Sequence, residues 1–250
     1  MKSYKIIFSP TGGTRKVTDV LANAFGADSE EVDISRPDFN GCSLNDDGIA
    51  LISVPSFGGR APKIAMERLK LVQGNGMAAV VIAVYGNRAQ EDTLIEAADI
   101  AKECGFRVIA GIEAIAEHSI VRRYAAGRPD KGDEAQLAGF AKQILDQMER
   151  RSNSEPAIPG NRPYKKSGAG LVPKAGSSCV KCGLCASECP VGAISKDAPR
   201  LTNKELCINC MRCVSICPHG ARTVNSMMVK IVGAALKKGC SDRKDNKLYL

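Results

Sequence analysis

The sequence predicts an α/β fold: a doubly wound sheet of five parallel strands, followed by a small cysteine-rich α+β domain. Apolar strand patterns alternate with amphipathic helical patterns over about the first 150 residues. Eight of the eleven cysteines then fall in one duplicated run between Cys179 and Cys217. At 250 residues, the chain is long enough for one medium domain and one small domain.

The strand pattern is carried by five short apolar segments. The clearest is residues 77–85, a nearly continuous apolar run. Residues 48–55 form a second such run, which ends at a proline that has no N–H for a sheet ladder. Continuous apolar runs are typical of strands that are buried on both faces, as in a parallel sheet. The predicted strands are 4–8, 31–34, 48–55, 77–85 and 106–115.

Helical patterns separate these strands. In residues 14–25, Val17, Val20 and Leu21 recur on one helix face. The other predicted helices of this region are 63–72, 90–104 and 133–150. Because strands and helices alternate, the helices are expected to cover both faces of the sheet.

The remainder of the chain divides into three parts. Residues 151–174 are rich in Pro, Gly, Lys and Ser, which predicts a linker that can also pack across the sheet domain. Residues 226–238 predict a helix, and the charged tail to Leu250 is expected to be mobile. The predicted domains are therefore 1–150 and 175–225, with the linker at 151–174 and a C-terminal helix and tail at 226–250.

The cysteine run has the spacing C-x-x-C-x-x-C-x-x-x-C-P, first from Cys179 and again from Cys207. This spacing resembles the bacterial two-cluster ferredoxin signature, in which the fourth cysteine of each run ligates the cluster of the other run. Zinc sites do not need this doubled spacing, and an odd cysteine count without a secretory signal disfavours disulfides. The predicted [4Fe–4S] ligand sets are Cys179, Cys182, Cys185 and Cys217 for the first, and Cys207, Cys210, Cys213 and Cys189 for the second.

A second motif lies between the first predicted strand and the first helix. It reads Ser9-Pro10-Thr11-Gly12-Gly13-Thr14-Arg15 and brings three hydroxyls and two glycines to a helix N-terminus. Backbone N–H groups and the helix dipole favour a phosphate there. The motif is neither a Walker loop nor a dinucleotide-binding Gly-x-Gly-x-x-Gly pattern. The alternative is an ordinary strand–helix turn capped by Thr14.

This loop is similar to the phosphate loop of flavodoxins, Ser/Thr-x-Thr-Gly-x-Thr. The resemblance implies strand order 2-1-3-4-5, with FMN at the switch point beside strands one and three. Phe57 and Tyr85 are then candidates to lie near the isoalloxazine, or else anchors that pack their loops on the sheet. The predicted cofactor-binding residues are Ser9, Thr11, Gly12, Gly13, Thr14, Ser56, Phe57, Gly58, Gly59, Tyr85, Gly86, Asn87 and Arg88.

From Ser9 to Gly220 the chain resembles the fused flavodoxin–ferredoxin proteins of anaerobes, called EFR-type ferrodoxins. The resemblance implies an iron–sulfur flavoprotein that passes single electrons between two [4Fe–4S] clusters and FMN, with a redox partner protein such as a low-potential ferredoxin or reductase. One alternative is an FMN-dependent reductase of a small-molecule acceptor, which would use the loop 117–130. His118 is its candidate catalytic residue, unless it only bonds backbone. The other alternative is a redox module dedicated to one partner enzyme.

The formal charge of +8 is the only sign of nucleic-acid binding. Two oxidised cluster sites at about −2 each and a flavin phosphate would reduce it to about +2, so no nucleic-acid partner is expected. No apolar run reaches membrane-spanning length, and the N-terminus has no signal-peptide block. A cytoplasmic protein of an anaerobic cell is therefore expected, without a membrane partner.

Overall fold

The sheet of this protein has the predicted order of parallel strands. A computed structural model describes residues 1–26, 28–44, 48–150, 155–168 and 170–250. The parallel strands are β1 (Lys2–Ile7), β2 (Ser29–Asp33), β4 (Gly48–Pro55), β6 (Ala78–Tyr85) and β7 (Arg107–Ile115). They pair in the order β2-β1-β4-β6-β7, which is 2-1-3-4-5 among the predicted strands and is the flavodoxin-like order.

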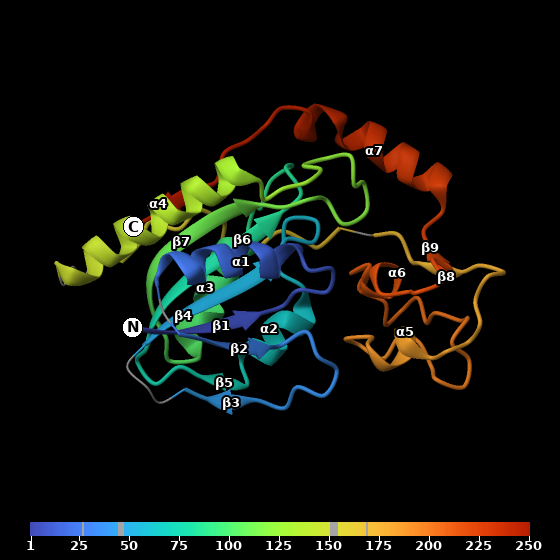
Figure 1. The fold of residues 1–250 in the computed structure, drawn as a ribbon, viewed down its shortest axis with the longest axis horizontal. Helices are drawn as coiled ribbons and strands as arrows, with labels where there is room; N and C mark the ends of the chain where they lie inside the picture. The colour runs from blue at the N-terminus through green and yellow to red at the C-terminus, as the bar shows by residue number, and fades with distance from the viewer. Residues whose placement is uncertain (27, 45–47, 151–154, 169) are drawn as a thin grey trace.

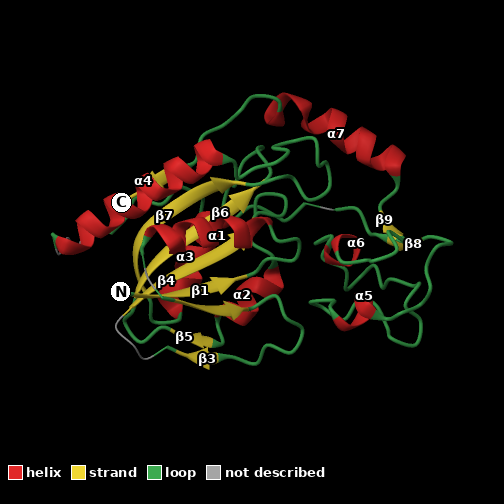
Figure 2. Cartoon of the chain, in the orientation of Figure 1, coloured by secondary structure: helices red, strands yellow, loops and turns green. Residues whose placement is uncertain are grey.

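Helices cover both faces of this sheet (Figure 2). One apolar core lies on the side of α1 (Gly13–Ala24) and α4 (Lys131–Glu149), and contains Val17, Leu21 and Leu137. The other core lies on the side of α2 (Lys63–Leu69) and α3 (Thr93–Glu103). The apolar side chains of the central strands are thus buried on both faces, as their continuous apolar runs predict.

The C-terminal tail is not mobile, so that prediction is wrong. Its strand β10 (Lys247–Tyr249) pairs antiparallel with β7 and gives the sheet a sixth strand. Just before it, the Asn246 side chain accepts the N–H of Ile115 at 2.9 Å and donates to Asp133 at 3.1 Å. A strand of three residues is too short to show an apolar period, so the sequence gave no sign of it. The contacts of Asn246 join residues that are far apart in the chain, and these leave no local pattern either.

The hydrogen bond between Tyr249 and the buried Glu113 gives a stability test of this strand. The Tyr249 hydroxyl donates to Glu113 Oε1 at 2.6 Å. Tyr249→Phe leaves Glu113 Oε1 with only the long bond from Gln90 Nε2, at 3.5 Å, so we expect the free energy of unfolding to fall by about 1–3 kcal/mol. Anaerobic thermal unfolding of the holoprotein measures it. Tyr164→Phe is the control, because its acceptor Asp99 keeps an exposed ion pair with Arg162. An equal loss of stability in both variants would contradict the prediction.

The described part of the predicted linker is hydrogen-bonded to the N-terminal end of α3. Asp92 accepts the backbone N–H groups of Asn161 and Lys165, at 2.8 and 2.7 Å. Ile158 packs against the core on the same face. Residues 151–154 and 169 of this linker lie outside the described residues.

The cysteine-rich region forms a small lobe beside the sheet, and α7 (Ser226–Cys240) runs across the top of both (Figure 1). Strands β8 (Lys174–Ala175) and β9 (Arg222–Thr223) pair antiparallel at the ends of this lobe. Between them lie α5 (Leu184–Ser187) and α6 (Arg212–Ser215), at equivalent places in the two cysteine runs. A further short pair joins β3 (Cys42–Ser43) and β5 (Val72–Gln73). Among the described helices, none has the length and apolar character needed to cross a bilayer.

Candidate cofactor sites

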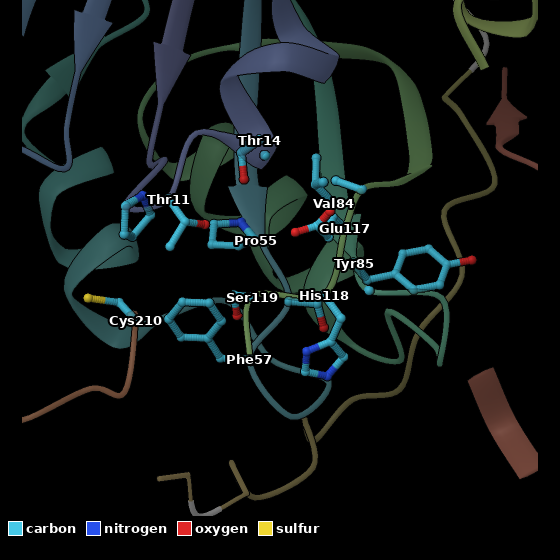
Figure 3. Close-up of a pocket in the computed structure, with 15 residues that line it drawn as sticks. Thr11, Thr14, Pro55, Phe57, Val84, Tyr85, Glu117, His118, Ser119 and Cys210 are labelled. Carbon is cyan, nitrogen blue, oxygen red and sulfur yellow. The ribbon is translucent and has the colours of Figure 1, made fainter. Parts of the chain in front are cut away.

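The phosphate loop begins helix α1 and lines a cavity. Gly12 is the N-cap of α1 with φ of +88°, a conformation that favours glycine. The first N–H groups of a helix have no intrahelical partner and are available to an anion. Thr11, Gly13 and Thr14 line the cavity (Figure 3). Ser9 is buried below the loop, where its Oγ accepts the N–H of Arg15 at 3.0 Å.

The loops after β4, β6 and β7 meet at the same cavity. Ser56 and Phe57 line it from the β4 loop, Gly86 from the β6 loop and His118 from the β7 loop. A Cβ at Gly86 would lie 2.6 Å from the Cβ of His118, so only glycine allows these two loops to approach each other. The carboxyl ends of parallel strands meet at one sheet edge, which is why these distant segments converge.

A wider cavity of about 230 Å³ continues from the first. Phe57, Gly86 and His118 line both cavities, and Gly58 and Gly59 line the wider one. Part of its wall comes from outside the sheet domain: Gly168, Gly170, Ile208, Asn209, Val232 and Leu236. The linker, the second cysteine run and α7 therefore enclose this end of the site.

Two predicted site residues, Tyr85 and Asn87, direct their polar groups away from the cavities. Tyr85 lines both cavities, but its hydroxyl points away from Phe57 and His118 in Figure 3. Burial, with the nearby Glu113 carboxylate, raises the pKa of Tyr85 to about 12. Asn87 is absent from the described lining of both cavities, because its side chain donates to the carbonyls of Cys240 and Asp242 at 2.8 Å.

Arg88 lines the wider cavity with its guanidinium bound to Glu91. The loop 117–130 contributes Glu117, His118, Ser119 and Ile120 to the cavities. Two of its arginines form ion pairs, Arg128 with Asp133 and Arg122 with Glu117, and both line a further cavity together with Thr11.

His118 bonds backbone and faces the cavity at the same time. Its Nδ1 accepts the N–H groups of Ile120 and Val121, at 3.1 and 3.2 Å. A neutral ring that accepts at Nδ1 carries its proton on Nε2. Burial lowers the pKa of His118, which keeps the ring neutral at physiological pH.

The lowered pKa of His118 predicts a pH effect on stability. Below about pH 6.5, the ordinary histidine pKa, the unfolded chain binds a proton that the folded chain resists, so this contribution is lost as the pH falls. We expect His118→Asn, whose amide oxygen can replace the Nδ1 acceptor, to flatten the dependence of Tm on pH between about 5 and 7. His219→Asn is the matched control on the other histidine. Equal slopes for wild type and His118→Asn would contradict this prediction.

The first predicted ligand set lines one cavity in the cysteine-rich lobe. Its members are Cys179, Cys182, Cys185 and Cys217. In the second set, the thiols of Cys207, Cys210 and Cys213 act electrostatically on one another and on Cys189. Burial raises the pKa of Cys210 to about 12 and that of Cys213 to about 11. The first predicted set thus lines one cavity, whereas Cys213 of the second set also packs against Cys185 of the first, so the division of the cysteines into two sets stays a prediction.

Backbone N–H groups support one thiolate of each set. The N–H of Ala193 donates to Cys189 Sγ, and that of Ala221 to Cys217 Sγ, both at 3.3 Å. Burial opposes ionisation of Cys217, but N–H donors outweigh it and lower its pKa. The described residues include no group of His, Cys, Asp and Glu side chains placed around a single metal ion. In a [4Fe–4S] cluster each thiolate binds a different iron, and eight soft ligands with N–H···S bonds fit such clusters.

Cys210 connects the two sites, which the sequence did not reveal. It lines the flavin-type cavity together with Phe57 and Thr11 (Figure 3). Two arginines hold the lobe in this position: Arg68 donates to the carbonyls of Ile34 and Pro190 at 2.9 and 2.7 Å, and Arg212 pairs with Glu188 and reaches Ser35. Contacts between residues so far apart in the chain leave no local pattern.

Comparison with known proteins agrees with the division of the chain into a sheet domain and a cysteine-rich lobe. Residues 178–222 match the family described as 4Fe-4S dicluster domain. A search of curated proteins found no match. Similar solved structures include a Streptococcus pneumonia TIGR4 flavodoxin (16% identity, 59% of this chain and 99% of that chain, TM-score 0.41). Another is the two-electron reduced flavodoxin of Megasphaera elsdenii (18% identity, 56% and 96%, TM-score 0.35).

Because these TM-scores are low, the flavodoxin-like assignment rests on the strand order of the sheet. The match over 178–222 assigns the cysteine-rich lobe. With a flavodoxin-like sheet at its N-terminus and a 4Fe-4S dicluster domain after it, the chain has the architecture of a flavodoxin–ferredoxin fusion.

Proposed function

We propose that this protein is an electron-transfer iron–sulfur flavoprotein, with FMN in the cavity of the sheet domain and two [4Fe–4S] clusters in the cysteine-rich lobe. The observation that carries the proposal is the position of Cys210, a predicted cluster ligand that lines the same cavity as Thr11 and Thr14. When bound, clusters exchange single electrons and a flavin accepts one or two. The protein supplies their positions.

Different segments hold the two ends of the flavin. The hydroxyls of Thr11 and Thr14 and the first N–H groups of α1 bind the phosphate. Phe57 and the backbone at Gly58 and Gly86 line the space for the ring system. His118 offers an Nε2–H donor there, because its Nδ1 is already engaged by backbone.

The two ligand sets have different surroundings, which suggests where a partner binds. Contacts with the sheet domain occur at the second set: Cys210 lines the flavin cavity, Ile208 packs against the sheet-domain core, and Arg68 binds the carbonyl of Pro190 beside Cys189. In the first set, Cys182 is exposed. We therefore expect a redox partner protein, such as a low-potential ferredoxin or reductase, to exchange electrons at the first set.

Anaerobic purification followed by cofactor analysis tests this function. The expected result is one FMN and about eight iron atoms per chain. Rapid-mixing reduction by reduced ferredoxin, NADH and NADPH then identifies the class of donor. A protein that contains zinc and no flavin would overturn the proposal.

The wider cavity favours a second candidate function, a reductase of a small-molecule acceptor. Its volume of about 230 Å³ would be shared between the ring system and an acceptor bound beside His118. In this case a small acceptor would reoxidise the reduced protein in a saturable reaction. A rate that is strictly first order in every acceptor tested would favour the electron carrier over the reductase.

A further inference from the structure

Arg222 is a cation buried inside the cysteine-rich lobe. Its relative exposure is 2%, and it is among the largest fully buried side chains of the described residues. The guanidinium donates to Thr202 Oγ1 at 2.6 Å and to the carbonyl oxygen of Pro199. Among the residues that the structure describes, none accepts a hydrogen bond from its Nε. Since both acceptors are neutral oxygens, these bonds leave the positive charge uncompensated, which is costly in a protein interior.

The charge of Arg222 lies among the predicted cluster ligands. Arg222 lines the cavity that holds the first set, whose thiols include Cys182 and Cys217. It also lies near the second set, because its strand β9 contacts α6, which carries Cys213. The charge of Arg222 therefore lies close to both ligand sets.

The duplication shows that the fold does not require a cation at this position. Each run continues as Cys-Pro-x-Gly-Ala, and the next residue is Ile194 in the first run and Arg222 in the second. Ile194 is also buried, at 4% exposure, and packs with Cys185 and Ala186. An apolar side chain thus fits the position in one half, and a buried guanidinium in the other half needs an anion to balance it.

We propose that Arg222 is a fixed counter-cation that stabilises the reduced state of the iron–sulfur clusters and so raises their reduction potentials. The inference rests on the proposed function, since it needs clusters at the two cysteine sets. Reduction adds one negative charge to a cluster, and a nearby cation in a medium of low dielectric constant favours that charge. Arginine keeps its charge throughout the working pH range, so the effect does not vary with pH.

Arg222→Gln removes the charge and keeps a hydrogen-bonding side chain, whereas Arg222→Lys keeps the charge. Anaerobic redox titration, followed by the electron paramagnetic resonance of the reduced clusters, gives the midpoint potentials. We expect Arg222→Gln to reduce the equilibrium constant for reduction at least tenfold for one or both clusters, a shift of 59 mV to more negative potential for one electron. The matched control is Arg200→Gln, which removes an exposed cation that bonds Gly176 in the same lobe; its potentials should stay at the wild-type values.

An Arg222→Gln protein with full iron content and wild-type potentials would overturn the inference. If that variant does not retain iron, Arg222→Ile gives a second test, because Ile194 fills the equivalent buried position of the first run. Arg222→Ile also removes the charge, so its potentials should become more negative, whereas those of Arg222→Lys should stay near the wild-type values. An iron-loaded Arg222→Ile protein with wild-type potentials would refute the proposal. A wild-type protein without iron would instead refute the proposed function.

Discussion

The Thr11→Ala/Thr14→Ala double variant should lose FMN while its iron content stays unchanged. Both threonines line the narrow end of the flavin cavity at the start of α1. Each hydroxyl that bonds a charged phosphate contributes about 1.5–3 kcal/mol, so removing both should weaken binding about 100-fold or more. Equilibrium dialysis or fluorescence titration of FMN measures the affinity, and the iron assay reports on the cysteine-rich lobe.

The matched control is Thr11→Ser/Thr14→Ser, which shortens both side chains and keeps both hydroxyls. It should bind FMN within a few-fold of wild type. If the alanine variant kept its flavin, or if the serine variant lost it to the same extent, Thr11 and Thr14 would not be the phosphate ligands. A parallel loss of iron from the alanine variant would indicate general unfolding.

Replacing one ligand in each cysteine set should affect the flavin differently. Cys210→Ala and Cys182→Ala should each lower the iron content from about eight to about four atoms per chain. Only Cys210 lines the flavin cavity, whereas Cys182 lies in a cavity formed entirely by residues 179–222. We therefore expect a change in the fluorescence lifetime of the bound flavin with Cys210→Ala, and a lifetime near that of wild type with Cys182→Ala.

The free cysteine Cys42 provides the control for this experiment. It belongs to neither set and lies in β3, so Cys42→Ala should keep both the iron content and the flavin lifetime of wild type. If Cys182→Ala changed the flavin as strongly as Cys210→Ala, the arrangement of the two sets would differ from the one proposed. If Cys210→Ala kept all of its iron, Cys210 would not be a ligand.

Local sequence patterns predicted the central strands and major helices well. The nearly continuous run 77–85 corresponds to β6 (Ala78–Tyr85), and 48–55 corresponds to β4. Both are buried on two faces, so nearly every side chain in them had to be apolar. The short strands β3, β5, β8, β9 and β10 were not predicted, because two or three residues cannot show a period.

The sequence predicts those site residues that belong to local motifs, and misses those whose position depends on contacts between distant segments. The ligand sets are predicted from the resemblance to two-cluster ferredoxins, whose Cys-x-x-Cys-x-x-Cys spacing is a local constraint on how a chain wraps a cluster. Thr11, Thr14 and Phe57 also line the cavity as expected. Asn87 was expected at the cofactor but holds the C-terminal segment instead, because its partners Cys240 and Asp242 are distant in the chain.

By itself, the sequence determined which residues are available for each cofactor: a phosphate loop at Ser9–Thr14 and a duplicated cysteine run from Cys179 to Cys217. Those motifs lie within single turns and loops, where chain connectivity fixes the spacing. Only the tertiary structure decided that the second run faces the flavin cavity, that α7 encloses this cavity, and that Arg222 is buried among the cysteines. These arrangements depend on packing between segments far apart in the chain, which no local pattern records.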